Sequence, residues 1–184
     1  SKRKQSEIKP PDSVPCLFIT GQVHSQFLRP DPEVRQVGFQ ETDIVSIVKP
    51  ITKYAKMITD PLSTKYELEK ALFMAHEGRP GPVLLDIPLN IAKQQINPDE
   101  LVGFDKESAQ TTYDLGVIDK KIDQLLEDLK QAKQPVMLVG GGVRIAGAAE
   151  EFWAVGEKLK IPVFPTWNAL DVVTSDWQWY GGRI

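Results

Sequence analysis

The chain has 184 residues, with 22 Lys or Arg against 25 Asp or Glu and a net charge of −3 at pH 7. This near-balance excludes the strongly basic surface that is typical of nucleic-acid-binding proteins, and a single cysteine excludes a disulfide scaffold. No apolar run approaches the roughly 20 residues that a membrane helix needs. We therefore expect a soluble intracellular protein of one large or two small domains, cytoplasmic or, in a eukaryote, organellar.

The first half of the chain predicts an α/β layer. Residues 1–12 are charged and end near a proline pair, which indicates an arm or linker. Short apolar runs without polar alternation, at 14–20 and 83–87, each predict a strand buried on both faces. Residues 51–58 predict a third strand. Residues 22–35 contain two prolines and no periodicity, so they predict a long loop, a feature that is often functional.

A helix is predicted over residues 65–76, directly before the second of the buried strands. Its start is indicated by Thr64 and Glu67, which have capping-box spacing, and its end by Gly78. Four apolar residues recur at helical spacing and should face the core: Leu68, Ala71, Leu72 and Ala75.

The second half predicts another α/β unit after a polar interdomain linker at residues 94–116. Its elements alternate in type: helix 117–132, strand 136–139, helix 148–159 and strand 161–164. This order implies a parallel sheet with right-handed crossovers. Two short parallel strands cannot cover the helices that they recruit, so we expect residues 117–184 to be an incomplete domain.

Three consecutive glycines at residues 140–142 lie between a predicted strand and a predicted helix, where backbone N–H groups can receive a phosphate. The dinucleotide fingerprint would require a glycine at position 145, which is Ile145. A tight turn and a ligand loop therefore stay open as alternatives. His24 and His76 are too isolated to predict a metal site.

Two other groups of residues are candidates for a function. Glu41 and Asp43 follow the long loop, but no partner acid or base can be placed beside them, so no acid–base role is assigned. Trp177 and Trp179 could stack on a ligand ring, although packing is the favoured interpretation.

Several blocks of sequence, in order, resemble segments of the acetolactate synthase large subunit. The clearest are Gly-Phe-Gln-Glu-Thr-Asp-Ile-Val at residues 38–45 and Gly-Arg-Pro-Gly-Pro-Val-Leu-Leu-Asp-Ile-Pro at 78–88. Further matches lie at residues 17–23, 49–53, 135–142 and 161–166. The resemblance implies an α/β fold with parallel-sheet layers: the later part of a pyrimidine-binding domain at 13–93, a linker at 94–116, and the first part of a Rossmann-like central domain at 117–184.

The resemblance also implies an activity. Enzymes of this family use thiamine diphosphate with Mg²⁺ at a subunit interface, decarboxylate a 2-oxo acid such as pyruvate, and ligate the two-carbon unit to a second 2-oxo acid. Several bind FAD, and they serve branched-chain amino acid biosynthesis. A homodimer or homotetramer is therefore expected, with no nucleic-acid or membrane partner.

Individual residues match family positions. Phe39 and Gln40 match a Phe-Gln pair at the active site. Positions that line the flavin site of FAD-binding members are matched by Arg79, Gly140, Gly141 and Gly142, and Thr166 lies near another flavin contact. Leu89 replaces a lysine that contributes to the flavin site of the synthases, which argues against FAD binding. The loop at 24–37 is longer than theirs, so the substrate can differ. The cofactor-activating glutamate and the Gly-Asp-Gly motif that holds the metal lie outside this chain, which alone should be inactive.

Two alternatives stay open at this point. One is a different thiamine-diphosphate-dependent 2-oxo acid decarboxylase or carboligase. The other is a module without chemistry of its own, either nucleotide-binding through residues 140–142 or purely structural.

Overall fold

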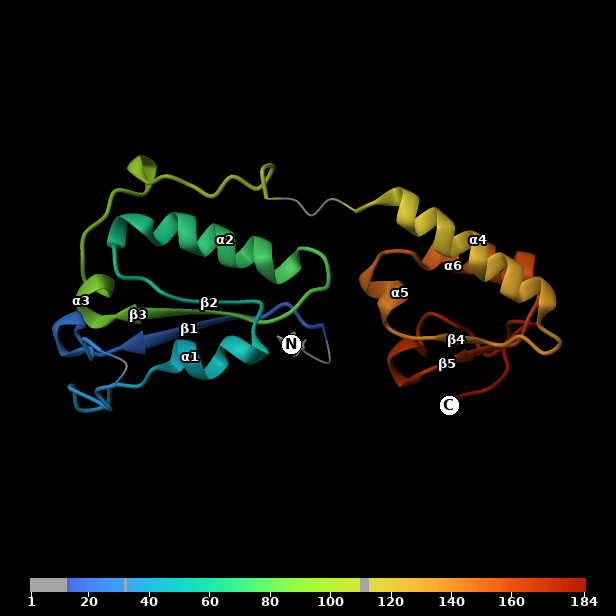
Figure 1. Cartoon of the computed structure of the whole chain (residues 1–184), viewed down its shortest axis with the longest axis horizontal. Helices are drawn as coiled ribbons and strands as arrows, with labels where there is room; N and C mark the ends of the chain where they lie inside the picture. Colours follow the sequence, from blue (N-terminus) through green and yellow to red (C-terminus); the bar gives the residue numbers. More distant parts are fainter. Residues whose placement is uncertain (1–12, 32, 110–112) are drawn as a thin grey trace, which may run out of the picture. The chain divides into compact units, whose positions relative to one another are not determined.

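The computed structural model describes residues 13–31, 33–109 and 113–184, so the predicted arm at 1–12 lies outside the described residues. The chain divides into two compact units, Ser1–Thr112 and Tyr113–Ile184 (Figure 1). Each unit combines helices with parallel strands, which confirms the predicted α/β fold class.

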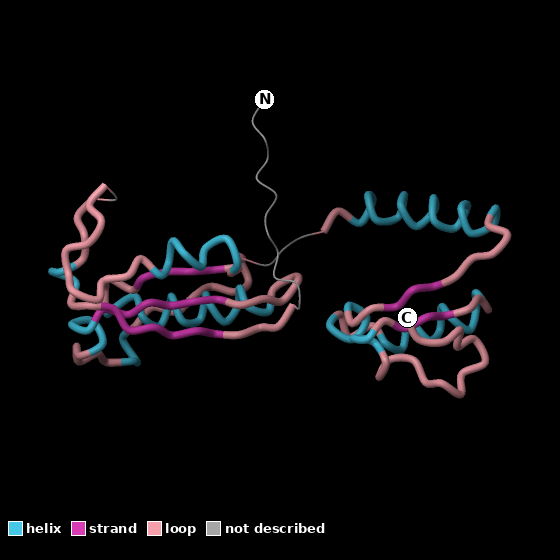
Figure 2. Tube along the Cα trace, turned by 90° about the horizontal axis from the view of Figure 1, so that it is seen from below, coloured by secondary structure: helices cyan, strands magenta, loops and turns pink. Residues whose placement is uncertain are grey.

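The sheet of the first unit has three strands: β1 (Leu17–Gln22), β2 (Tyr54–Met57) and β3 (Val83–Pro88). Their order is β1-β3-β2, and both pairings are parallel. Figure 2 shows the strands of this sheet running side by side. β3 is therefore the central strand, and all but one of its residues are buried. Its branched apolar residues suit this position because a central parallel strand is covered on both faces. The predicted buried strand at 83–87 is confirmed.

Two helices lie on opposite sides of this sheet, α2 (Thr64–His76) and α1 (Ile44–Val48) (Figure 1). The α2 side holds the core, whose buried residues are Ile58, Ala71, Ala75, Val83, Leu85 and Ile91. The last of these belongs to α3 (Leu89–Ala92), which follows β3 directly. The predicted helix at 65–76 is confirmed, although Leu72 is exposed rather than facing the core.

The predicted buried strand at 14–20 is wrong in extent and in burial. β1 begins at Leu17, and Phe18 and Ile19 are 53% and 61% exposed. The physical reason is position: β1 is an edge strand, with a neighbour on one side only. An apolar run predicts a strand but not its place in the sheet.

Two smaller expectations also fail. The predicted strand at 51–58 is reduced to β2, since Lys49–Ile51 forms a 3-10 turn around Pro50, which has no N–H to donate to a ladder. The predicted capping box is absent: Ser63 is the N-cap of α2, with no side-chain capping bond. The Glu67 carboxylate instead accepts from the Tyr54 hydroxyl, because Glu67 is buried against β2.

The second unit has β4 (Met137–Val139) and β5 (Val163–Pro165), which pair in parallel. Its helices are α4 (Leu115–Gln131), α5 (Gly142–Ile145) and α6 (Ala149–Leu159). The core consists of Val139, Val163, Ala169, Val172 and Val173. Trp177 packs against Phe152 and Trp153, and Trp179 adjoins the same core, so the packing interpretation of these tryptophans is confirmed.

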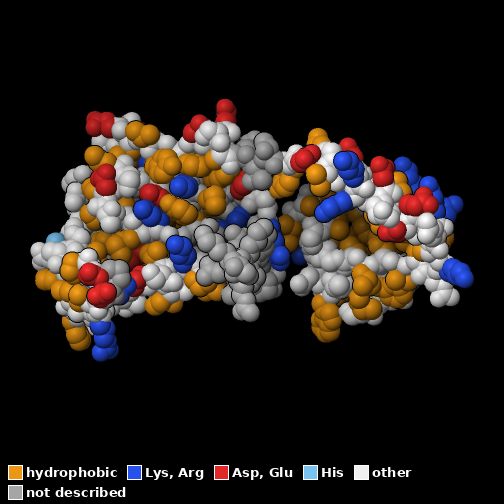
Figure 3. All heavy atoms as spheres, in the orientation of Figure 1, with side chains coloured by type: hydrophobic (Ala, Val, Ile, Leu, Met, Phe, Trp, Pro, Cys, Tyr) orange, Lys and Arg blue, Asp and Glu red, His pale blue; other side chains and the backbone are white. Residues whose placement is uncertain are grey.

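α4 forms with the predicted apolar face, but none of its residues is buried. Ile118, Ile122 and Leu125 are 41%, 47% and 56% exposed. In Figure 3 hydrophobic side chains are visible beneath this helix. Its start is fixed by Asp114, whose carboxylate accepts from the N–H groups of Gly116 and Val117. Within the described residues, no helix is long and apolar enough to cross a membrane.

Candidate functional site

The candidate site lies at the carboxyl ends of β1 and β3. These ends meet at one edge of the sheet because the two strands are parallel, with Gln22 opposite Pro88. The chain leaves β1 at this edge and returns to α1 at residue 44, and Figure 1 shows residues 23–31 and 33–43 gathered there. Ligands of open α/β sheets bind beyond the carboxyl ends of the strands. The predicted loop at 22–35 lies in this segment except for Gln22, which ends β1, and it is interrupted by a 3-10 turn, η1 (Ser25–Phe27).

The buried carboxylate of Asp86 anchors this segment to the sheet. Asp86 is 0% exposed and lies near the end of β3. It accepts hydrogen bonds from Thr20 Oγ1 at 2.7 Å and from Gln22 Nε2 at 3.0 Å. The same Gln22 nitrogen donates to the carbonyl oxygen of Thr42 at 2.6 Å. Gln22 thus ties the end of β1 both to β3 and to the returning end of the loop.

This anchor was not predicted from the sequence, although the sequence contains a signal for it. Asp86 is the one charged residue in an apolar strand, and Thr20 and Gln22 alternate on one face of the neighbouring strand. Polar side chains that share a sheet face across a parallel pair can reach one another, but recognising this requires the register.

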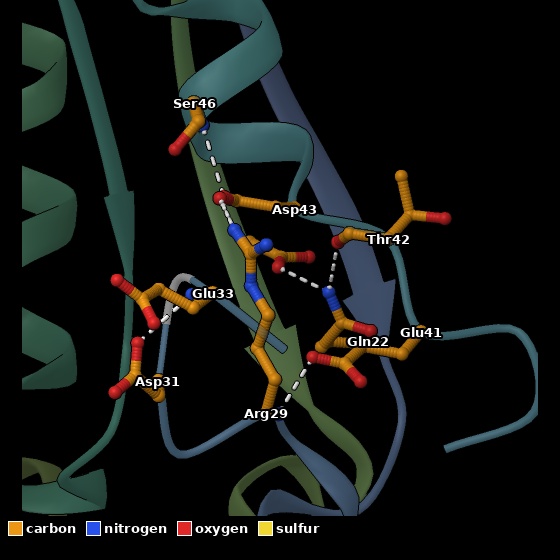
Figure 4. A network of polar contacts seen from close by, with 9 residues as sticks. Gln22, Arg29, Asp31, Glu33, Glu41, Thr42, Asp43 and Ser46 are labelled. Atoms are coloured by element: carbon orange, nitrogen blue, oxygen red, sulfur yellow. Dashed lines mark hydrogen bonds and ion pairs between the residues drawn. The ribbon is translucent and has the colours of Figure 1, made fainter. Parts of the chain in front are cut away.

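The Glu41 carboxylate closes the loop on itself (Figure 4). Its Oε1 accepts from the backbone N–H of Arg29 at 2.7 Å, and its Oε2 accepts from those of Val37 at 2.8 Å and Gly38 at 3.3 Å. The Val37 N–H, followed by that of Arg29, lowers the pKa of Glu41 below its ordinary value. A carboxylate that accepts several N–H groups is stabilised in its charged form.

Asp43 joins the same loop to α1. Its Oδ1 accepts from the Ser46 N–H at 3.1 Å, which caps the helix. Its Oδ2 forms an ion pair with the Arg29 guanidinium. The bonds from Ser46, and then the positive charge of Arg29, lower the pKa of Asp43. Glu41 and Asp43 are therefore both engaged in holding the loop, with hydrogen bonds that an acid–base role would have to break.

Phe39 and Gln40 lie at the turn that these contacts hold. Phe39 is 90% exposed, and Gln40 has a φ of 71°, in the left-handed region that few residues other than glycine adopt. Gly38 is buried beside them, and a Cβ there would lie 3.0 Å from both the Cβ and the carbonyl oxygen of Phe27. The loop therefore presents an aromatic ring outward on a constrained backbone. The assignment of both residues to an active site stays a prediction.

The residues matched to a flavin site fall in both units. In the second unit, residues 140–142 follow β4, and Thr166 follows β5, at the carboxyl ends of the two strands. An ideal Cβ on Gly140 would lie 3.8 Å from Thr166 Oγ1, so the structure brings these residues together. Arg79 belongs to the first unit, where its Nε donates to Ser13 Oγ at 2.6 Å.

The three glycines differ in what surrounds them. A Cβ on Gly141 would lie 2.9 Å from the carbonyl oxygen of Asn168, so close packing accounts for that glycine. A Cβ on Gly142 would meet no atom within 4 Å, which leaves space for another molecule. Among residues 13–31, 33–109 and 113–184, no group of three His, Cys, Asp or Glu could hold a metal ion.

The chain is similar in sequence to known proteins. Residues 122–184 match the family described as "Thiamine pyrophosphate enzyme, central domain". The chain is 38% identical to the acetolactate synthase large subunit of Corynebacterium glutamicum over 164 residues, 86% of this chain and 24% of the relative. It is 31% identical to the glyoxylate carboligase of Escherichia coli O157:H7 over 173 residues, 94% of this chain and 28% of the relative. A chloroplastic acetolactate synthase of Arabidopsis thaliana is 33% identical over 165 residues, 90% of this chain and 23% of the relative.

These matches confirm the predicted resemblance to acetolactate synthases and to thiamine-diphosphate-dependent enzymes. The chain spans about a quarter of the length of the curated relatives that it matches. The match over residues 122–184 fits a Rossmann-like central domain, whereas the assignment of residues 13–93 to a pyrimidine-binding domain stays a prediction.

Proposed function

We propose that this chain, which resembles acetolactate synthases over most of its length, is part of a thiamine-diphosphate-dependent carboligase. The reaction would decarboxylate a 2-oxo acid, pyruvate in the first instance, and join the two-carbon unit to a second 2-oxo acid. The observation that supports this proposal best is the constrained loop at the carboxyl edge of the sheet, which presents the exposed Phe39 beside Gln40.

The two side chains suit different tasks in such a reaction. A 90% exposed aromatic ring is costly to leave in water, so Phe39 is suited to pack against a cofactor or substrate and exclude water from it. The Gln40 amide can both donate and accept hydrogen bonds, so it can orient the carbonyl or carboxylate of a 2-oxo acid. The constrained backbone reduces the entropy lost when a ligand is bound.

Thiamine diphosphate, when bound, would supply the stabilised carbanion for decarboxylation and ligation. The described residues offer no cluster for Mg²⁺, and the family resemblance places the metal-binding motif and the activating glutamate outside this chain. Of the carboligation site, we therefore assign to the chain the Phe39–Gln40 loop alone, and we expect the isolated chain to be inactive. The complete enzyme is proposed to be an intracellular homodimer or homotetramer.

FAD binding is a separate proposal. It is supported by the proximity of Gly140 to Thr166 at the carboxyl ends of β4 and β5, and by the open space beside Gly142. Gly142 and Thr166 would hold a phosphate-bearing ligand there. The exposed Leu89, in place of a synthase lysine, is the residue that argues against FAD.

A second carboligation is favoured by one observation. The match to the glyoxylate carboligase covers 94% of this chain, more than the 86% covered by the Corynebacterium glutamicum synthase. We therefore propose glyoxylate, another 2-oxo acid, as the alternative substrate. The chemistry assigned to Phe39 and Gln40 is the same for both acids.

The test uses the complete natural subunit that contains this chain. Its visible spectrum should be recorded for flavin, and its consumption of pyruvate and of glyoxylate measured with thiamine diphosphate and Mg²⁺. Formation of acetolactate supports the main proposal, and turnover of glyoxylate alone supports the alternative. Phe39→Ala and Gln40→Ala should lower kcat/KM by about tenfold or more, whereas Gln26→Ala, an exposed change in the same loop, should not. Absence of bound thiamine diphosphate would contradict both proposals.

A further inference from the structure

The backbone of Gln40 needs an external restraint. Its φ of 71° lies in the left-handed region, which costs a residue with a side chain free energy unless the surroundings fix it. Gln40 is itself exposed, as is Phe39 before it, so packing around these two side chains cannot supply that restraint. The restraint must come from neighbouring residues of the loop.

Glu41 supplies it, because its carboxylate joins the two halves of the loop. Arg29 lies on the outgoing half, while Val37 and Gly38 lie on the returning half, directly before Phe39. One carboxylate oxygen accepts from the first half at 2.7 Å, and the other accepts from the second half at 2.8 and 3.3 Å. Figure 4 shows the Glu41 side chain turned toward Arg29.

This arrangement requires two acceptor oxygens. In a glutamine one of the two positions would be an NH₂ group, which can only donate. That group would face a backbone N–H, either of Arg29 or of Val37, and at least one bond to a charged acceptor would be lost. A glutamine therefore matches Glu41 in shape but cannot accept hydrogen bonds from both halves of the loop.

We propose that Glu41 is a positioning residue, whose carboxylate holds the loop in the conformation that presents Gln40 to the substrate. The contact of Gln40 with the substrate rests on the proposed carboligase activity. The restraint itself rests only on the contacts of Glu41 within the loop.

Glu41→Gln tests the proposal, with Glu33→Gln as its matched control. Glu33 lies in the same loop and is exposed, and its backbone N–H rather than its carboxylate donates a hydrogen bond, to Asp31 Oδ1 at 2.8 Å. Two readouts are needed: amide hydrogen exchange at Val37 and Gly38, resolved by NMR, and the kcat and KM of the complete subunit with thiamine diphosphate, Mg²⁺ and the 2-oxo acid.

We expect Glu41→Gln to speed exchange at Val37 and Gly38 by about tenfold, the effect of losing one hydrogen bond to a charged group. kcat should fall by a similar factor while the bound thiamine diphosphate stays unchanged. Glu33→Gln should alter neither readout. A merely structural role for Glu41 would lower the melting temperature and the amount of active enzyme but would leave kcat per active site unchanged.

Two results would overturn the proposal: unchanged exchange at Val37 and Gly38, or faster exchange with kcat intact. An inactive wild-type subunit contradicts the carboligase proposal instead, and the exchange data still decide whether Glu41 holds the loop. If Glu41→Gln does not accumulate in folded form, the hydrogen-exchange protection of Val37 can be measured in the wild type as the pH is lowered. Loss of this protection as Glu41 is protonated would support the restraint, and unchanged protection would overturn it.

Discussion

Replacement of Gln22 by leucine should destabilise the first unit strongly. The Gln22 Nε2 donates to Asp86 Oδ2 at 3.0 Å and to the Thr42 carbonyl at 2.6 Å, and Gln22 is only 9% exposed. A hydrogen bond to a charged group contributes about 1.5–3 kcal/mol and a neutral one about 1 kcal/mol. The expected loss is therefore about 3 kcal/mol, which is a large part of the roughly 5–15 kcal/mol that stabilises a typical domain.

The assay can separate the two units. All four tryptophans lie after residue 150, in the second unit, so the denaturant midpoint of tryptophan fluorescence reports on that unit and should not change. Exchange of the Leu85 amide in β3 reports on the first unit, and it should speed up about a hundredfold for a loss of about 3 kcal/mol. Gln26→Leu, an exposed change on η1, is the control. An acceleration below about threefold at Leu85 would refute the anchoring role of Gln22.

Three further outcomes are expected. Gly38→Ala should destabilise the first unit by about 1–3 kcal/mol, because the new Cβ would lie 3.0 Å from the Phe27 carbonyl oxygen; an unchanged urea midpoint for loss of far-UV circular dichroism would contradict this. Lys160→Gly should stabilise the second unit by about 0.5–1 kcal/mol, since Lys160 ends α6 with a φ of 53°; a lower tryptophan-fluorescence midpoint would contradict that. Acid should open the candidate-site loop, because the pKa of Glu41 is lowered by folding: its stabilisation is fully present above the ordinary value of 4.5 and is lost as the pH falls through the lower folded pKa. NMR protection of Val37 should record this loss, and Glu41→Gln should abolish its pH dependence.

Much of the layer structure could be predicted from the sequence because it depends on local patterns. The apolar run at 83–87 bounded by Gly and Pro predicts a covered strand, and the structure places β3 at the centre of its sheet. The helix at 65–76 follows from apolar spacing and from the stop at Gly78, which adopts a φ of 59°. Periodicity and turn chemistry act within one segment, so they can be read without the fold.

The candidate site depends instead on contacts between distant segments. Asp86 meets Thr20 and Gln22 across separations of 66 and 64 residues, and these contacts exist only in the register of β1 with β3. Glu67 shows the same limit within a correctly predicted helix. Its spacing from Thr64 predicts a capping box, but the Tyr54 hydroxyl offers a buried partner from another element and the side chain turns to it.

α4 shows why an apolar pattern predicts a helix but not its partner. The spacing of Ile118, Ile122 and Leu125 produces one apolar face, and the helix forms where it was expected. The face is nevertheless exposed, because the buried strand residues Val139 and Val163 pack into a core with residues after β5, and Leu138 of β4 is itself 64% exposed. Helical stability in proteins comes mostly from packing an apolar face, so α4 should be held less firmly than α6, whose Phe152 packs against the core. The apolar spacing of a helix therefore predicts that one of its faces needs a packing partner. Which element supplies that partner depends on the whole sheet rather than on the helix.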